Sequence, residues 1–325
     1  MWLLRILKIA AVLTPFIPSR IGYLVCRILG LAYWLVNRRT RRNVASNLLM
    51  VAPDSGLFRR NILSARVSIT VVTNYYDLLR MRSVDRTTIL DLVELTGLEN
   101  VERALEQGKG AIILSAHVGN FSVMARLPSA LGYDAAIVAE RIQPAELFNY
   151  MARLRSAMGI RVIPPDSSML RNVTSLLKRN GILLLAGDRD VSGLGHRVRF
   201  FGRETTLPAG PIMLAMRTGA PVLPAVTLRN REHRSTVWIG PPICLTQTGD
   251  RERDLECNMI TAVQQLERMI SIDPGQWAVL QRVWPPTSHF GRSEGIGSAD
   301  TPDATGLESE ALPGREDDSA VRRGR

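Results

Sequence analysis

The stretch at residues 115–122 holds the histidine best placed to do chemistry. It reads SAHVGNFS, and His117 lies between an apolar run typical of a buried strand and a segment typical of a helix. In open α/β sheets, ligands gather at the carboxyl ends of the strands. A neutral imidazole there takes a proton from a hydroxyl group and makes its oxygen nucleophilic, while Gly119 lets a substrate approach closely. A structural role is the alternative for a single histidine.

A second polar group, GDRD at residues 187–190, follows another apolar run. It is therefore expected at the same edge of the sheet. The carboxylates of Asp188 and Asp190 are suited to orienting His117 or an acceptor sugar, and Arg189 is suited to holding a phosphate. The alternative is a surface loop whose charges pair with one another.

Further charged residues are expected near these two groups. Glu140 ends an expected strand, and Arg155 projects from the helix that follows it. A helix is expected to begin at residues 208–211, and a helix N-terminus is a natural anion site. Three arginines precede it, namely Arg197, Arg199 and Arg203. Together these residues suit the phosphates of coenzyme A, a phosphopantetheine arm or a phospholipid headgroup.

The elements that must position these residues follow from the hydrophobic pattern. Residues 43–108 carry apolar side chains at helical spacings. From about residue 109, short apolar runs alternate with amphipathic stretches. Strands are expected at 111–115, 135–139, 162–163, 182–186, 221–228 and 236–239, and helices at 120–131, 143–158, 169–177, 208–219 and 255–270. This alternation predicts an α/β fold with helices packed on a sheet.

The first 36 residues are very apolar, but basic residues interrupt them and Pro15 and Pro18 divide them. We expect two helices that lie in or partly in a membrane interface, with the basic side chains extending to the headgroups. The cluster RRTRR at 38–42 would be drawn to anionic lipid. The alternatives are a signal peptide, two core helices, or a short spanning helix over residues 21–36.

Composition narrows the class of partner. The formal net charge is +11, which suits a polyanionic partner, and no nucleic-acid signature accompanies it. An anionic membrane surface is therefore preferred to nucleic acid. The three cysteines are scattered and form no disulfide framework, and the four histidines lack metal-ligand spacing, so neither disulfide nor metal is expected. Residues 286–325 are polar and are expected to be a disordered tail.

Several motifs in order resemble the lipid A biosynthesis acyltransferase family, which includes the lauroyl and myristoyl transferases and the phosphatidylinositol mannoside acyltransferases. The resemblance runs from the N-terminus to about residue 285. Its carriers are AHVGNF at 116–121, VAER at 138–141, GDRD at 187–190, FFG at 200–202, LPAGP at 207–211, and DPGQW at 273–277 with Arg282 and Trp284. The forms of the first and third motifs are most similar to the mannoside branch.

The resemblance implies a glycerolipid-acyltransferase-like α/β sheet at the cytoplasmic face of the bacterial inner membrane. It implies an acyl-coenzyme A or acyl-carrier-protein donor, a glycolipid or lysophospholipid acceptor, and no separate cofactor. In the family's H-x4-D/E motif the histidine deprotonates the acceptor hydroxyl and the acid orients and charges the histidine. The hydroxyl attacks the thioester directly, so no acyl-enzyme is needed. The implied domains are membrane-associated helices at 1–42, an acyltransferase domain at 43–285 and the tail.

One position departs from the family motif, because Ser122 stands where the family has Asp or Glu. A serine carries no charge to stabilise an imidazolium, and losing an orienting acid costs a histidine-based site several powers of ten in rate. Three readings stay open. Another carboxylate (Asp188, Asp190 or Glu140) supplies the charge, or Ser122 positions His117 by a hydrogen bond, or the protein binds lipid without acyl transfer.

The sequence therefore predicts a membrane-associated acyltransferase, with a non-catalytic lipid-binding relative as the alternative. We expect catalysis to depend on His117, Ser122 and Asp190. The residues expected to bind substrate are Asn120, Glu140, Arg155, Asp188, Arg189, Arg199 and Arg203.

Overall fold

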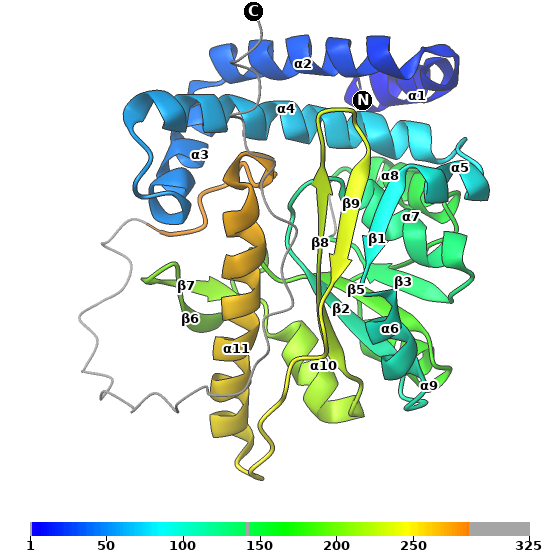
Figure 1. The fold of residues 1–325 in the computed structure, drawn as a ribbon, viewed down its shortest axis with the longest axis vertical. Coiled ribbons are helices and arrows are strands. Elements are labelled where there is room, and N and C mark those ends of the chain that lie inside the picture. Colours follow the sequence, from blue (N-terminus) through cyan, green and yellow to red (C-terminus); the bar gives the residue numbers. More distant parts are fainter. Residues whose placement is uncertain (1, 141–142, 286–325) are drawn as a thin grey trace, which may run out of the picture.

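The computed structural model describes residues 2–140 and 143–285 of the chain. Its centre is a seven-stranded sheet in the order β1-β9-β8-β2-β5-β3-β4 (Figure 1). The strands are β1 Val93–Thr96, β2 Ala111–Ser115, β3 Ala135–Val138, β4 Arg161–Ile163, β5 Ile182–Ala186, β8 Val222–Arg229 and β9 Ser235–Ile239. Only β8 and β9 pair antiparallel, so β2, β3, β4, β5 and β8 end along one edge of the sheet.

The middle strands β2 and β5 are buried on both faces. Successive side chains of a strand point to opposite faces, so Ile112 enters one hydrophobic core and Ile113 the other. The first core includes residues of α9 Met169–Lys178, α10 Gly210–Thr218 and α11 Arg251–Ile272, and the second includes residues of α6 Leu98–Leu105, α7 Phe121–Leu131 and α8 Ala145–Ser156. Burial on both faces explains why these strands are continuous apolar runs.

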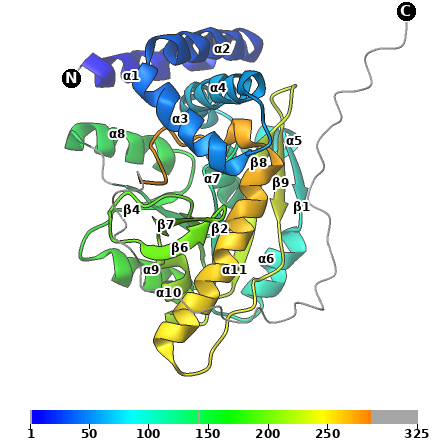
Figure 2. The same ribbon diagram turned by 90° about the vertical axis from the view of Figure 1, so that its left-hand side faces the viewer.

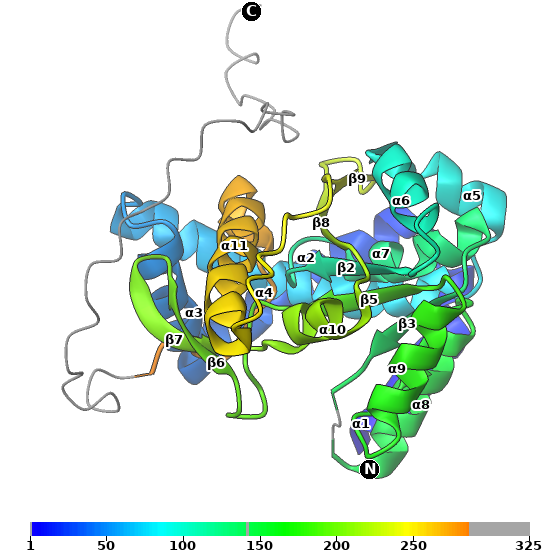
Figure 3. The same ribbon diagram turned by 90° about the horizontal axis from the view of Figure 1, so that it is seen from below.

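A separate two-stranded hairpin lies beside α11 (Figure 3). It consists of β6 His196–Phe200 and β7 Arg203–Leu207, paired antiparallel. Phe200 at the end of β6 is fully buried and stacks on Trp284, with ring centroids 5.4 Å apart. The same ring meets Trp277 edge-on at 6.5 Å, so aromatic residues from distant parts of the sequence form one cluster.

A helical layer covers the carboxyl edge of the sheet (Figures 1 and 2). Its elements are α1 Trp2–Leu13, the 3-10 turn η1 Thr14–Phe16, α2 Ser19–Val36, α3 Arg38–Val51, α4 Leu57–Met81 and α5 Arg86–Asp91. The long helix α4 crosses this edge, and α2 lies along the outer side of α4. The strand ends therefore face α4, and α2 is the outer helix of the layer.

Small residues at every fourth position let α2 approach α4 closely. Gly22, Cys26 and Gly30 lie on one face of α2 and are buried. A Cβ atom built on Gly30 would lie 2.5 Å from the Cα atom of Ile69, closer than real Cβ contacts. The position therefore requires glycine despite its cost in helix propensity.

The α/β class, the apolar N-terminal helices and the alternation from residue 109 onward are confirmed. The prediction that residues 43–108 are wholly helical is wrong, because β1 lies within them. Its four residues, VELT, are too few to show a clear period of two, and β1 is an edge strand whose alternate residues are exposed. The expected disordered tail at 286–325 lies outside the described residues.

Candidate active site

The sheet register brings His117 beside Asp188. Ser115 ends β2 opposite Ala186 at the end of β5, so the residues two places further along each chain are neighbours. The ring Nδ1 of His117 lies 2.7 Å from Oδ1 of Asp188, and the backbone N–H of His117 donates to Oδ2 at 3.0 Å. A carboxylate accepts the Nδ1 proton, which leaves Nε2 as the basic nitrogen.

Asp188 is completely buried, and a third donor reaches its carboxylate. The indole Nε1 of Trp277 donates to Oδ2 at 2.7 Å. Burial by itself raises the pKa of Asp188, but the charge of His117 and the three hydrogen bonds outweigh it and lower the pKa from 3.8 to about 2. The carboxylate is therefore ionised at neutral pH and stabilises a positive charge on the imidazole.

The histidine itself remains accessible. Its side chain is 26% exposed, while that of Asp188 is 0% exposed. Phe121, the first residue of α7, meets the imidazole edge-on with ring centroids 6.2 Å apart. The Asp188 carboxylate is therefore shielded from solvent, while the imidazole of His117 is accessible to a substrate, as a general base requires.

A segment from the C-terminal part of the domain clamps the backbone on either side of His117. The 3-10 turn η2 Pro274–Gln276 leads into residues 276–278, which run antiparallel to residues 117–119. Ala278 N donates to His117 O at 2.7 Å, and Gly119 N donates to Gln276 O at 3.0 Å. Trp277 lies between the two residues that make these bonds, so they hold it beside His117.

Gly119 allows the segment after His117 to pack closely against β8. Its φ is 63°, in the left-handed region, and a Cβ atom there would lie 1.8 Å from the carbonyl oxygen of Thr227 on β8. The expectation that this glycine makes room for a substrate is corrected, since the space is filled by β8.

Ser122 and Asn120 are structural rather than directed at the histidine. The Ser122 hydroxyl is buried and donates to the backbone oxygen of Asn74 on α4 at 3.4 Å. The Asn120 side chain caps α7 by accepting from Val123 N, and it donates to Ser235 Oγ at 3.5 Å. The expectations that Ser122 orients His117 and that Asn120 binds substrate are therefore corrected, because both side chains point into the protein.

Asp190 also has a structural place. One carboxylate oxygen accepts from the backbone of Ser192 and Gly193, and the other accepts from Gly195 N and the Thr206 hydroxyl. These hydrogen bonds close the loop between β5 and β6, and they lower the pKa of Asp190 against the opposing effect of burial. The expectation that Asp190 takes part in catalysis is corrected, because Asp188 is the acid that contacts His117.

Arg189 links two of the predicted motifs. Its guanidinium contacts Glu140 Oε2 at 3.0 Å and Gln281 Oε1 at 2.9 Å. It lines a cavity of about 230 Å³, together with Thr206, Gln281 and Arg282. The cavity is polar and is lined by two arginines, Arg189 and Arg282, and by the acidic Asp190.

The remaining predicted arginines are dispersed. Arg155 is half-buried in α8, and burial lowers its pKa. Arg199 and Arg203 lie on the hairpin, one on each strand, with Arg199 exposed. The structure does not bring these three side chains together with Arg189 into a single cluster.

Comparison with known proteins shows the family to which the chain belongs. The family described as bacterial lipid A biosynthesis acyltransferase matches residues 1–285. The chain belongs to this acyltransferase family. Similar proteins include a phosphatidylinositol mannoside acyltransferase of Mycolicibacterium smegmatis, 29% identical over 164 residues, which are 49% of this chain and 54% of the relative. A protein of the same name from Mycobacterium tuberculosis is 31% identical over 131 residues, 39% of this chain and 42% of the relative.

The chain spans about half the length of the curated relatives it matches.

In this member of the acyltransferase family, the sheet brings another acid to the histidine in place of the missing motif acid. Ser122, which occupies the acid's position in the H-x4-D/E motif, is buried in α7 and donates to α4, whereas Asp188 reaches the imidazole from the end of the neighbouring strand β5. Trp277, which donates to Asp188, is part of the DPGQW motif. The motif is visible in the sequence, but the sequence alone did not predict a role for Trp277.

The lowered pKa of Asp188 predicts how stability changes with pH. A carboxyl whose folded pKa is depressed stabilises the fold above its unfolded pKa, and this contribution is lost as the pH falls through the folded value. The free energy of unfolding of the wild type relative to Asp188→Asn should be constant between about pH 5 and 6.5, then fall by about 2 kcal/mol toward pH 2. Denaturant titrations across this range measure it. A difference that stays constant down to pH 2.5 would contradict the assignment.

Proposed function

We propose that this protein transfers a fatty acyl chain from an acyl thioester to a hydroxyl group of a glycolipid or lysophospholipid. The observation that carries the proposal is the pair of accessible His117 and buried, ionised Asp188 at the carboxyl edge of the sheet. Membership of the acyltransferase family supports the same chemistry. The names of the similar mycobacterial proteins favour a mannosylated phosphatidylinositol as one acceptor to test.

The proposed reaction is a direct transfer. Nε2 of His117 takes the proton of the acceptor hydroxyl, and the oxygen attacks the carbonyl carbon of the thioester. The carbon–sulfur bond breaks as the new ester forms, and the departing thiolate takes the proton from Nε2. Asp188 holds the Nδ1 proton throughout and stabilises the transient imidazolium. The thioester, carried by coenzyme A or acyl carrier protein, is a substrate, and the reaction calls for no separate cofactor.

The cavity lined by Arg189 suits the polar part of either substrate. Arg189 and Arg282 line it together with Gln281, Thr206 and the acidic Asp190, and Arg189 also contacts Glu140. Guanidinium groups bind phosphate through paired hydrogen bonds. A phosphate of the donor or of a phospholipid headgroup is therefore the group that we propose for this cavity.

The alternative function, lipid binding without acyl transfer, rested on the serine at position 122. The contact between Asp188 and His117 supports acyl transfer over this alternative, because Asp188 can supply the negative charge that Ser122 lacks.

We also propose that α1 and α2 lie in the surface of the bacterial inner membrane on its cytoplasmic side. Exposed large apolar side chains include Ile9 of α1, Leu24, Ile28 and Val36 of α2, and Phe16 of the turn η1 between them. By length and composition α2 could cross a membrane, but its inner face is packed along α4, which belongs to the body of the domain. A helix fixed along α4 supports an interfacial position, with the basic cluster at 38–42 near anionic headgroups.

An acyl-transfer assay tests the proposed activity. Purified protein in detergent is given radiolabelled palmitoyl-coenzyme A or palmitoyl-acyl carrier protein, with lysophospholipids or mannosylated phosphatidylinositol as acceptors. The wild type should form labelled acylated lipid, and His117→Ala should lower the rate by about 10²-fold or more, because the general base is gone. Equal rates for the two proteins, with both folded by circular dichroism, would refute the role of His117.

Vesicle flotation tests the membrane surface. Leu24→Glu and Ile28→Glu should each weaken binding to anionic vesicles by about tenfold or more, because burying one such side chain is worth about 1.5 kcal/mol or more. Both side chains are exposed, so the melting temperature should not change. Ile260→Glu, on the exposed face of α11, is the matched control and should bind as the wild type does. Equal binding by all four proteins would rule out this surface.

A further inference from the structure

The DPGQW motif at residues 273–277 lies between the dyad and the helical layer. Asp273 is bound by Arg66 of α4, with Nη2 and Oδ2 2.6 Å apart, and it caps the turn by accepting from Gly275 N at 3.1 Å. The hydroxyl of Thr70, also on α4, donates to Gly275 O at 3.4 Å. The motif is therefore attached to α4 at its first and third residues, and its last residue is the Trp277 that donates to Asp188.

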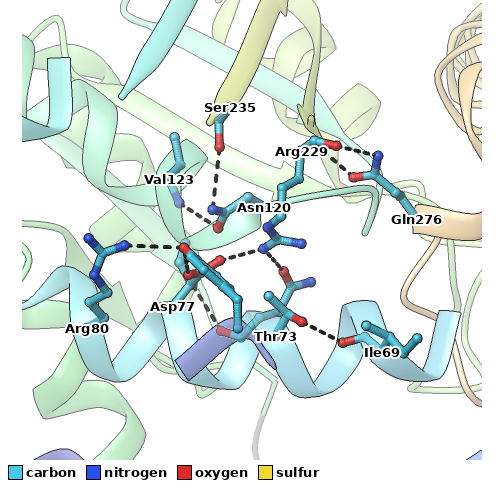
Figure 4. A network of polar contacts seen from close by, with 12 residues as sticks. Ile69, Thr73, Asp77, Arg80, Asn120, Val123, Arg229, Ser235 and Gln276 are labelled. Carbon is cyan, nitrogen blue, oxygen red and sulfur yellow. Dashed lines mark hydrogen bonds and ion pairs between the residues drawn. The ribbon is translucent and has the colours of Figure 1, made fainter. Parts of the chain in front are cut away.

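Gln276 attaches the motif to the end of β8 by two hydrogen bonds (Figure 4). Its Oε1 accepts from Arg229 N at 2.9 Å, and its Nε2 donates to Arg229 O at 2.9 Å. The amide side chain thus pairs with the backbone of Arg229 as a neighbouring strand would. Gln276 is 7% exposed, so water does not replace these bonds readily.

The side chain of Arg229 continues this connection to the outer helices. Its Nη2 contacts Asp77 Oδ2 on α4 at 2.5 Å (Figure 4). The same nitrogen donates to Asn74 Oδ1, also on α4, at 2.8 Å. The hydroxyl of Tyr23 on α2 donates to the other oxygen of Asp77 at 2.8 Å. The side chains of Arg229 and Asp77 are 8% and 0% exposed, so the ion pair is buried.

A buried ion pair is weak evidence for stabilisation, because removing two charges from water costs about as much as their attraction returns. The positions of the two side chains are nevertheless tightly restricted, because each buried charge must keep its hydrogen-bond partners. Arg229 is therefore fixed relative to α4. Because Gln276 is bonded to the backbone of Arg229, the next residue, Trp277, is fixed relative to α4 as well. An error of about 1 Å in a catalytic group costs about 10²-fold in rate.

We propose that Gln276 is a positioning residue for the dyad, which acts by fixing Trp277 and through it the carboxylate of Asp188. The proposal rests on the acyltransferase function proposed above. The side chain of Gln276 bonds to Arg229 and Asp273 and not to the dyad, so we expect its effect on the rate of the chemical step and not on substrate binding. The same connection ends at Tyr23 of α2, which places the dyad in a fixed relation to the outer helix.

The test replaces Gln276 with methionine, which keeps the length of the side chain and removes both hydrogen bonds to Arg229, together with the one that Nε2 donates to Asp273 Oδ2 at 3.1 Å. Gln276→Met should lower kcat by about 10- to 100-fold and leave KM for donor and acceptor within about twofold. Gln264→Met is the matched control, because Gln264 is exposed on α11, and it should behave as the wild type does. An unchanged kcat, or a higher KM at wild-type kcat, would overturn the proposal.

A second readout does not depend on turnover. Nuclear magnetic resonance of protein with ¹⁵N-labelled histidine, assigned with His117→Ala, reports the Nδ1 proton shared with Asp188. Gln276→Met should shift or broaden this resonance, and Gln264→Met should not. A purely structural role would lower the melting temperature and leave the resonance in place. If the wild type shows no turnover but the resonance responds, the acyltransferase function fails and the positioning role stands.

A third variant keeps the proposal testable if Gln276→Met does not fold. Arg66→Met removes the ion pair to Asp273, in which the arginine side chain is 43% exposed. Exposed ion pairs contribute little to stability, so this variant should fold. It loosens the same motif from α4, and it should lower kcat several-fold and disturb the His117 resonance. Wild-type values for both would overturn the proposal.

Discussion

The buried carboxylate of Asp188 is the constraint on which the rest of the site depends. A fully buried charge is tolerated only when it is paired and hydrogen-bonded, and Asp188 receives donors from the ring of His117, the backbone of His117 and the indole of Trp277. Two of these donors belong to His117 just after β2, and the third belongs to a motif almost 90 residues after Asp188 in the chain. Both segments must therefore be in place before the carboxylate is stabilised, and the histidine is oriented in the same step.

The helix α4 contacts the site on its inner side and α2 on its outer side. On its inner side α4 supports the site, because it holds the backbone of the DPGQW motif, the ion pair to Arg229 and the buried hydroxyl of Ser122. On its outer side α4 carries α2 through the close packing at Gly22 and Gly30. In the proposed orientation, α4 fixes the distance between the membrane surface and the dyad, and the hydroxyl of a lipid acceptor held in that surface would meet His117 at a defined depth.

The sequence allowed the fold class and the two polar groups at the strand ends to be predicted, since buried parallel strands are continuous apolar runs and parallel strands end at one edge. It did not reveal which carboxylate contacts His117. Asp188 and Asp190 are both near the end of β5, and only the register and the direction of each side chain separate them. Gln276 and Arg229 were missed because their contact joins a side chain to a backbone, which leaves no pattern in composition or spacing.

The central claim is that Asp188 supplies the negative charge, and not the residue at position 122, where the family motif has its acid. The most direct measurement compares kcat of Asp188→Asn and Ser122→Ala with that of the wild type in the same acyl-transfer assay. The account predicts a loss of about 10²- to 10⁴-fold for Asp188→Asn, because the amide cannot stabilise an imidazolium, and a change below about threefold for Ser122→Ala. Near-normal turnover by Asp188→Asn, or an equal loss in both variants, would contradict it.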